Sequence, residues 1–209
     1  MEILGKLFGS EAKTKIIRLF LFNPEASYNA RDVSLRTNVK GRQIGSILMT
    51  LLNMGLIRKR TLSKEVKRNK KGRSVSKKTK ESVYFLDQRF PYASVLSDLM
   101  AEASVKVDNR LMAKLMPAGK IKLIIASGIF TRQSDARLDL LIAGDDINED
   151  KLARIIGSLE TDIGRDLVYS SLTTTDFQYR LGLHDRLIRD VIDFPHIILV
   201  DKIGFEDRK

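Results

Sequence analysis

The chain has 209 residues, of which 43% are hydrophobic and 30% are charged, and its formal net charge at pH 7 is +11. This composition is typical of a globular protein of one or two domains with enough apolar side chains for two modest cores. Cysteine is absent, so disulfide bonds are not expected. The first residues lack the apolar core of a signal peptide, and no apolar run approaches the ~20 residues that span a bilayer. We therefore expect a cytoplasmic location and no membrane partner.

The first part of the chain predicts two short helices. Ser10 is a suitable N-cap for an amphipathic helix that ends before Pro24. Asn29, with Asp32 three residues later, has the spacing of a capping box and opens a second helix. Residues 38–41 then favour a turn.

A third helix is predicted after this turn, and Gly55 closes it. Its buried stripe contains Ile44, Ile47, Leu48, Leu51 and Leu52. The N-terminal end of its other face carries long or hydroxyl side chains that can reach base edges and phosphates. These candidate DNA contacts are Lys40, Arg42, Gln43 and Ser46. The alternative interpretation is an ordinary amphipathic helix of the core.

The segment from Arg58 to Lys80 carries the excess charge of the whole protein. It contains twelve Lys or Arg residues and one acid, Glu65, so its net charge is +11, and the rest of the chain has 25 basic and 25 acidic residues. Because it lacks apolar periodicity and its charges repel one another, we expect an extended, solvated loop. Short strands are predicted on either side of this loop, at 57–62 and 82–86.

Three helices followed by two strands around a loop are the element order of a winged helix-turn-helix, predicted here over residues 1–88. The third helix would be the recognition helix, the basic loop the wing, and double-stranded DNA the partner. The alternative is a solvated loop without a partner. The expected DNA contacts in the wing are Arg58, Arg60, Lys67, Arg68, Lys70, Lys71, Arg73, Lys77 and Lys78.

Residues 89–117 are expected to link this domain to a second one. Apolar residues recur at steps of three and four between Pro91 and Met116, which predicts one helix. This helix either packs within the protein or contributes to a homodimer.

The remaining residues, 118–209, alternate between strand and helix patterns. Strands are predicted at 121–126, 138–143, 166–172 and 197–200, and helices at 147–160, 175–181 and 185–192. This order predicts a small mixed α/β sheet flanked by helices, so the fold class of the whole chain is α+β.

Ser127-Gly128 follows the first strand predicted in this half, and Arg137 and Asp139 stand two positions apart at the second. With these residues, the second half resembles the minimal nucleotidyltransferase fold, the small relative of DNA polymerase beta. That family places a Gly-Ser turn after its first strand, two metal-binding Asp residues on its second strand and a third Asp on a later strand. Here the turn is Ser127-Gly128, Arg137 takes the first carboxylate position and Asp139 takes the second. Asp166 is the candidate for the third.

This resemblance implies a domain that has lost its activity, because a cation at a metal-ligand position repels the metal. In segments 137–145 and 179–190, the chain resembles predicted prokaryotic transcription regulators in which a winged helix is joined to such a degenerate domain. We therefore expect a transcriptional regulator without a metal or cofactor, whose second domain binds a protein, a nucleotide or another copy of itself. An enzyme that modifies a protein or RNA, and an RNA-binding or antitoxin-like adaptor, are the alternatives.

Overall fold

The computed structural model describes residues 3–70, 73–104, 109–133 and 136–205. For residues 64–79 and 103–109 within these ranges, only the backbone is described. The chain divides into two compact units, the first formed by Met1–Ala103 with Thr161–Arg165 and the second by Ser104–Glu160 with Asp166–Lys209. The fold is mixed, with helices and strands in both units, as the sequence predicts.

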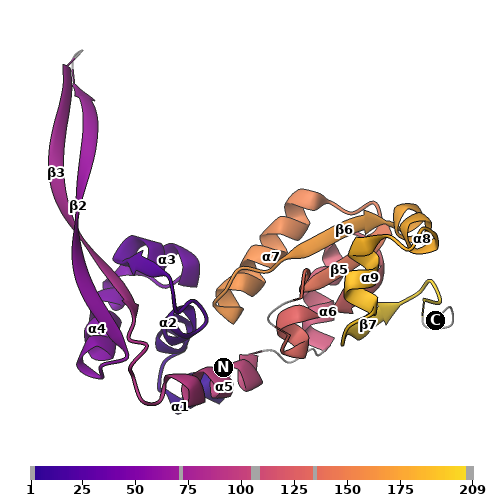
Figure 1. The fold of residues 1–209 in the computed structure, drawn as a ribbon, viewed down its shortest axis with the longest axis horizontal. Coiled ribbons are helices and arrows are strands. Elements are labelled where there is room, and N and C mark those ends of the chain that lie inside the picture. Colours follow the sequence, from indigo (N-terminus) through magenta and orange to yellow (C-terminus); the bar gives the residue numbers. More distant parts are fainter. Residues whose placement is uncertain (1–2, 71–72, 105–108, 134–135, 206–209) are drawn as a thin grey trace. The chain divides into compact units, whose positions relative to one another are not determined.

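The first unit combines short helices with a long β-hairpin (Figure 1). Its elements are α1 (Ile3–Leu7), α2 (Glu11–Leu21), β1 (Ser27–Asn29), α3 (Ala30–Thr37), α4 (Gly41–Asn53), β2 (Ile57–Lys70), β3 (Arg73–Leu86) and α5 (Ala93–Ser104). The short elements α1 and β1 were not predicted, because each contains too few residues to show a periodic pattern.

Local hydrogen bonds start α2 and α3 where the sequence predicts. The hydroxyl of Ser10 accepts a hydrogen bond from the backbone N–H of Lys13 at 3.3 Å. The side chain of Asn29 accepts one from the N–H of Asp32 at 2.7 Å, and the carboxylate of Asp32 accepts the N–H of Asn29 at 3.3 Å. This reciprocal pair confirms the predicted capping box.

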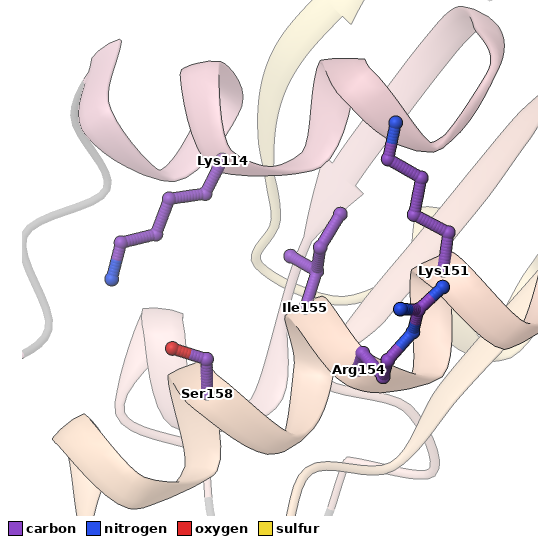
Figure 2. A pocket seen from close by; sticks show the side chains of 5 residues that line it. All are labelled: Lys114, Lys151, Arg154, Ile155 and Ser158. Carbon is purple, nitrogen blue, oxygen red and sulfur yellow. The ribbon is translucent and has the colours of Figure 1, made fainter.

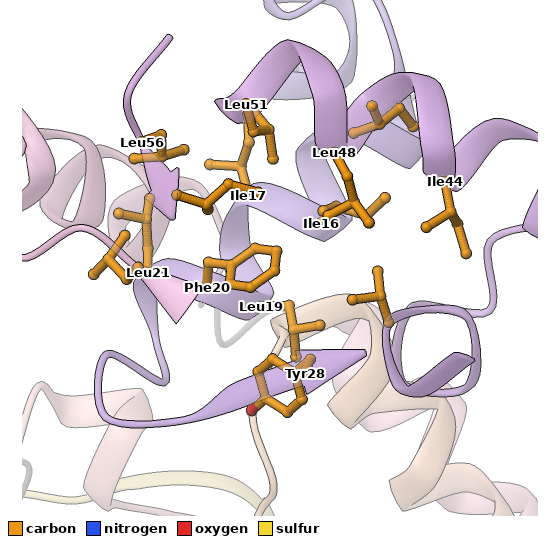
Figure 3. Packing of buried hydrophobic residues seen from close by; sticks show 14 of the residues in the cluster. Ile16, Ile17, Leu19, Phe20, Leu21, Tyr28, Ile44, Leu48, Leu51 and Leu56 are labelled. Atoms are coloured by element: carbon orange, nitrogen blue, oxygen red, sulfur yellow. The ribbon is translucent and has the colours of Figure 1, made fainter. Parts of the chain in front are cut away.

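Helices α2 and α4 supply much of the core of the first unit (Figure 3). Ile16 and Phe20 of α2 are completely buried, and Leu48 and Leu51 of α4 lie in the same cluster. Between α3 and α4, Asn38 adopts a left-handed conformation with φ of 52°, and the following Val39 is buried. The side chains predicted to face inward on α4 thus fix its orientation and leave its other face exposed.

The basic segment is not the solvated loop that we expected. Strands β2 and β3 pair as an antiparallel ladder from Ile57–Leu86 to Lys70–Arg73, and β1 extends the sheet at its base in the order β1-β3-β2. Ile57, Val83 and Leu86 are buried and attach this base to the core. Figure 1 shows the paired strands projecting well beyond the helices of this unit.

The cross-strand register explains how a run of cations forms a ladder. It places Lys67 opposite Ser76 and Lys78 opposite Glu65, and the one pair of cations that it places opposite each other is Lys70 and Arg73, at the far end of the described ladder. Four further cations also lie opposite uncharged residues: Lys64, Arg68, Lys77 and Lys80 face Thr79, Val75, Val66 and Ser63. Like charges directly opposite each other destabilise a sheet. A shift of one residue would put Lys64 opposite Lys80 and Lys67 opposite Lys77, so charge helps to select the observed register.

The second unit contains a mixed sheet with the strand order β6-β5-β4-β7, in which β5 and β6 are parallel and the other neighbours are antiparallel. Its strands are β4 (Lys120–Ala126), β5 (Leu140–Asp145), β6 (Tyr169–Thr173) and β7 (Ile197–Asp201). Its helices are α6 (Asn109–Leu115), η1 (Met116–Ala118), η2 (Gly128–Thr131), α7 (Glu149–Ile163), α8 (Thr174–Gly182) and α9 (Arg186–Ile192). The predicted mixed sheet is therefore confirmed.

The segment predicted as one linker helix appears as α5 and α6, and residues 105–108 between them lie outside the described range. In the second unit, Phe177 of α8 and Ile188 of α9 pack against sheet residues such as Leu141. Among the described residues, no helix has both the length and the apolar character needed to cross a membrane.

Candidate functional site

The outer face of α4 begins with a group of exposed polar side chains. Lys40 occupies the N-cap position without a side-chain capping bond, and Arg42, Gln43 and Ser46 are exposed on the first turns. Within the described part of the chain, the side chains of Arg42 and Gln43 have no hydrogen bond or ion pair to another residue. The four residues predicted on this face are therefore brought together and are accessible to another molecule.

Gly45 lies on the same face and is not required by the packing of the unit. A Cβ atom added there would meet nothing within 4 Å, and the residue is exposed. Glycine in a helix interior costs about 1 kcal/mol relative to alanine. Its presence leaves the backbone of α4 open to close approach beside Arg42 and Ser46.

The cations at the base of the hairpin are held by local contacts. Arg58 donates a hydrogen bond from Nε to Oδ2 of Asp87 at 2.6 Å. The guanidinium of Arg60 lies over the ring of Phe85, 5.7 Å from its centroid. Both arginines are exposed, so these contacts orient the side chains without covering them.

Burial and neighbouring groups have opposite effects on the pKa of Asp87. Burial opposes its ionisation, but hydrogen bonds from the Arg89 backbone N–H and the Arg58 side chain, with the positive charges of both residues, together lower the pKa of Asp87. The carboxylate is therefore kept ionised beside Arg58, at the foot of the hairpin.

The remaining predicted wing residues belong to the two strands. Lys67, Arg68 and Lys70 lie on β2, and Arg73, Lys77 and Lys78 lie on β3, while Lys71 is outside the described residues. From Thr61 to Lys70 the ladder extends about 30 Å, at ~3.3 Å per residue. The structure thus distributes these positions along two paired strands, where the sequence predicted an extended, solvated loop.

In the second unit, two residues of the predicted nucleotide pocket, Ser127 and Asp139, are buried and hydrogen-bonded to the backbone. Ser127 and Asp139 are only 2% and 4% exposed. The Ser127 hydroxyl donates to the carbonyl oxygen of Leu138 at 2.6 Å. Oδ1 of Asp139 accepts the N–H of Ile129, and Oδ2 accepts the N–H of Val168, both at 2.9 Å. Each oxygen of this carboxylate is therefore used to hold the backbone.

The other residues of that predicted pocket do not join a cluster of acids. Strands β5 and β6 begin at Leu140 and Tyr169, so Arg137 and Asp166 lie in the turns before them. Arg137 pairs with Asp190 at 3.1 Å, and Asp166 is exposed. Among the described residues, no group of three or more His, Cys, Asp or Glu side chains is arranged to hold a metal ion.

A groove that the sequence did not predict lies between α6 and α7 (Figure 2). Its lining residues are Lys114, Lys151, Arg154, Ile155 and Ser158. The spacing of the four residues on α7 places them on neighbouring turns of one helix. No pattern in the sequence predicted that Lys114 of α6 would lie beside these four residues.

Comparisons with protein-family models, with curated proteins and with solved structures found no match for this chain. Function therefore has to follow from the chemistry of the sites themselves.

Proposed function

We propose that this chain is a DNA-binding transcriptional regulator of the winged helix-turn-helix type, in which α4 enters a major groove and the β2–β3 hairpin is the wing. The observation that carries the proposal is the charge on that hairpin. The segment from Arg58 to Lys80 has a net charge of +11, equal to that of the whole chain, and it forms a projecting ladder. A concentrated positive surface of this kind attracts the phosphate backbone of nucleic acids.

The arrangement of α3 and α4 supports a helix-turn-helix. Residues 38–40 separate the end of α3 at Thr37 from the start of α4 at Gly41. A turn of three or four residues is typical of the motif, whose second helix contacts bases with its N-terminal residues. Arg42 and Gln43 are at that end, and arginine and glutamine suit bidentate contacts to guanine and adenine respectively.

The reach of the hairpin supports a duplex as the partner. Its outer part, about 30 Å long at ~3.3 Å per residue, is close to the ~34–36 Å of one turn of B-DNA. A rod of this length can follow phosphates across neighbouring grooves while α4 remains at its own site. We infer that the hairpin supplies affinity and that α4 supplies base preference.

The second unit is proposed to be a nucleotidyltransferase-like domain without transfer activity that serves regulation or assembly. Two features support the absence of transfer activity: both oxygens of Asp139 accept hydrogen bonds from backbone N–H groups, and Arg137 is paired with Asp190. A carboxylate used in this way is not presented to a metal ion. The partner of the domain is a protein, a nucleotide or a second copy of the chain.

Incubation with labelled nucleoside triphosphates, Mg²⁺ or Mn²⁺ and cell lysate tests the inactivity of this unit. The expected result is no transfer of label. Label transfer by the wild type that disappears in an Asp139→Ala variant shown to be folded would instead support an enzyme that modifies protein or RNA.

Sequencing of DNA fragments selected by the purified protein tests the proposed function directly. We expect an enriched consensus, and a palindromic one would also show that two copies bind. Arg42→Ala and Gln43→Ala should each weaken the preferred site by about 1–3 kcal/mol and flatten the preference at one position. The control is Arg186→Ala, which removes an arginine whose side chain is 81% exposed in the second unit.

An equal loss on every sequence in the Arg42 or Gln43 variants would show that these side chains contact only phosphate. Absence of any enriched duplex, together with binding to structured RNA, would replace the proposal with an RNA-binding role.

A further inference from the structure

The groove between α6 and α7 is open to solvent and has a volume of about 280 Å³. In Figure 2, Lys114 and Ser158 lie toward one end, Lys151 and Arg154 toward the other, and Ile155 lies between them. All five lining residues belong to the second unit. The groove therefore combines basic ends with an apolar middle.

Two cations of this groove, Lys151 and Arg154, differ from most others in the second unit. Lys120, Lys122, Arg137, Arg180, Arg186 and Arg189 each have a carboxylate within ion-pair distance. For Lys151 and Arg154, the described residues supply no such carboxylate. The groove lining contains no acid at all. Positive charge is thus left uncompensated beside a concave surface, where it favours an anion.

The chemistry of the lining residues selects the kind of anion. Arg154 donates its Nε hydrogen to the backbone oxygen of Asp150 at 3.1 Å, which orients the guanidinium and leaves its terminal nitrogens for a ligand. A guanidinium fork and a lysine ammonium are the usual pair for a phosphate group. Ile155 offers apolar contact to the body of the ligand, and the hydroxyl of Ser158 can donate to or accept from a polar group.

We propose that this groove binds a small phosphate ester with a flat or apolar body, of which a nucleoside monophosphate is the type. The phosphate lies at Lys151 and Arg154, and the rest of the molecule lies across Ile155 toward Ser158. The volume is near the lower end of the ~300–1,000 Å³ of ligand pockets, which favours a mononucleotide over a larger ligand. This groove is separate from the buried residues Ser127 and Asp139, and the binding proposed here does not depend on DNA binding.

Methyl NMR of the full chain, labelled at isoleucine, tests the proposal because Ile155 lies inside the groove. The Ile155→Val variant identifies its signal by removing it. Adenosine monophosphate should shift this signal saturably at millimolar concentrations, while adenosine should bind at least about ten times more weakly because it lacks the anion. The signal of Ile57, at the base of the hairpin, reports separately on any phosphate binding to the basic segment.

Charge variants decide whether the groove residues are responsible. Lys151→Gln combined with Arg154→Gln should weaken the effect of the monophosphate at least tenfold, and Ser158→Asp should do the same by placing an anion in the groove. Lys202→Gln, which removes an exposed lysine elsewhere in the same unit, should leave it unchanged. The proposal is overturned by the absence of a saturable Ile155 shift, by equal shifts with adenosine, or by an equal loss in Lys202→Gln.

Discussion

The carboxylate of Asp139 occupies the space that a Cβ atom on Gly128 would need, and Gly128 has a φ of 56°, in the left-handed region. The same carboxylate accepts the backbone N–H groups of Ile129 and Val168. The carboxylate of Asp139 thus packs against Gly128 and links two backbone segments by hydrogen bonds. The residue pattern that resembles a catalytic motif is here a device for holding two turns together.

Replacement of Asp139 by asparagine should therefore reduce stability. The amide can accept only one of the two N–H groups, and a buried donor left without a partner costs about 1–3 kcal/mol. Chemical denaturation of the full chain measures the loss for the second unit. Asp150→Asn, at an exposed position on α7, should change stability by about 0.5 kcal/mol or less. If Asp139→Asn were as stable as the wild type, the carboxylate would not have the structural role assigned to it.

Replacement of Gly45 by alanine should affect the stability of the first unit and its binding to DNA in opposite directions. Gly45→Ala should stabilise the first unit by about 1 kcal/mol, because the helix gains an alanine where nothing lies within 4 Å of the new Cβ atom. The same change should weaken DNA binding if the backbone of α4 lies against the duplex. Gly157→Ala is the matched control, since this glycine lies within α7 and its added Cβ atom also meets nothing. Melting curves and titrations with one duplex give both quantities; unchanged affinity in Gly45→Ala would place that face away from DNA.

The contact between Arg58 and Asp87 should make part of the stability depend on pH. The pKa of Asp87 is lowered in the folded protein, so its contribution is present above the pKa of the unfolded chain, near ~4, and is lost as pH falls through the folded value. Melting temperatures of wild type and Asp87→Asn should therefore differ at pH 6 and converge toward pH 2. Arg58→Gln should show part of the same convergence. A difference that stays constant over this range would contradict the assignment.

The helices of the first unit could be predicted because their signals are local. The capping residues Ser10 and Asn29 bond to backbone groups three residues away, and the stripe of α4 has a clear period. The strands at 57–62 and 82–86 were also predicted, but their extension to Lys70 and Arg73 was missed because its pairing is not local. The outer part of the ladder pairs residues such as Lys67 and Ser76, and the charges that lie opposite each other differ between one register and the next. Apolar periodicity contains neither kind of information.

The sites were predictable to different degrees. Lys40, Arg42, Gln43 and Ser46 are exposed together because the period of one helix places them on one face. The resemblance at Ser127 and Asp139 identified residues that do lie together, but hydrogen bonding to Val168, which lies 29 positions from Asp139, decides what the carboxylate does. The groove at Lys114 and Arg154 depends on the packing of two helices, which no local pattern reveals.

A salt titration of duplex binding tests the central claim that the hairpin supplies the affinity for DNA. If about five to eight of its cations neutralise phosphates, the plot of log affinity against log salt concentration should have a slope of about −4 to −7. The comparison variant changes Lys67, Arg68, Lys70 and Lys71 to alanine. Its matched control changes Lys120, Arg186, Arg189 and Lys202, four exposed cations of the second unit, to alanine.

The hairpin variant should lower the magnitude of the slope by up to about 3.6, since each lost phosphate contact removes ~0.9. It should keep the base preference that α4 supplies. Its melting curve should resemble that of the wild type, because Ile57 and Leu86 still hold the base of the hairpin in the core. The control should keep the wild-type slope. An unchanged slope in a folded hairpin variant would contradict the claim.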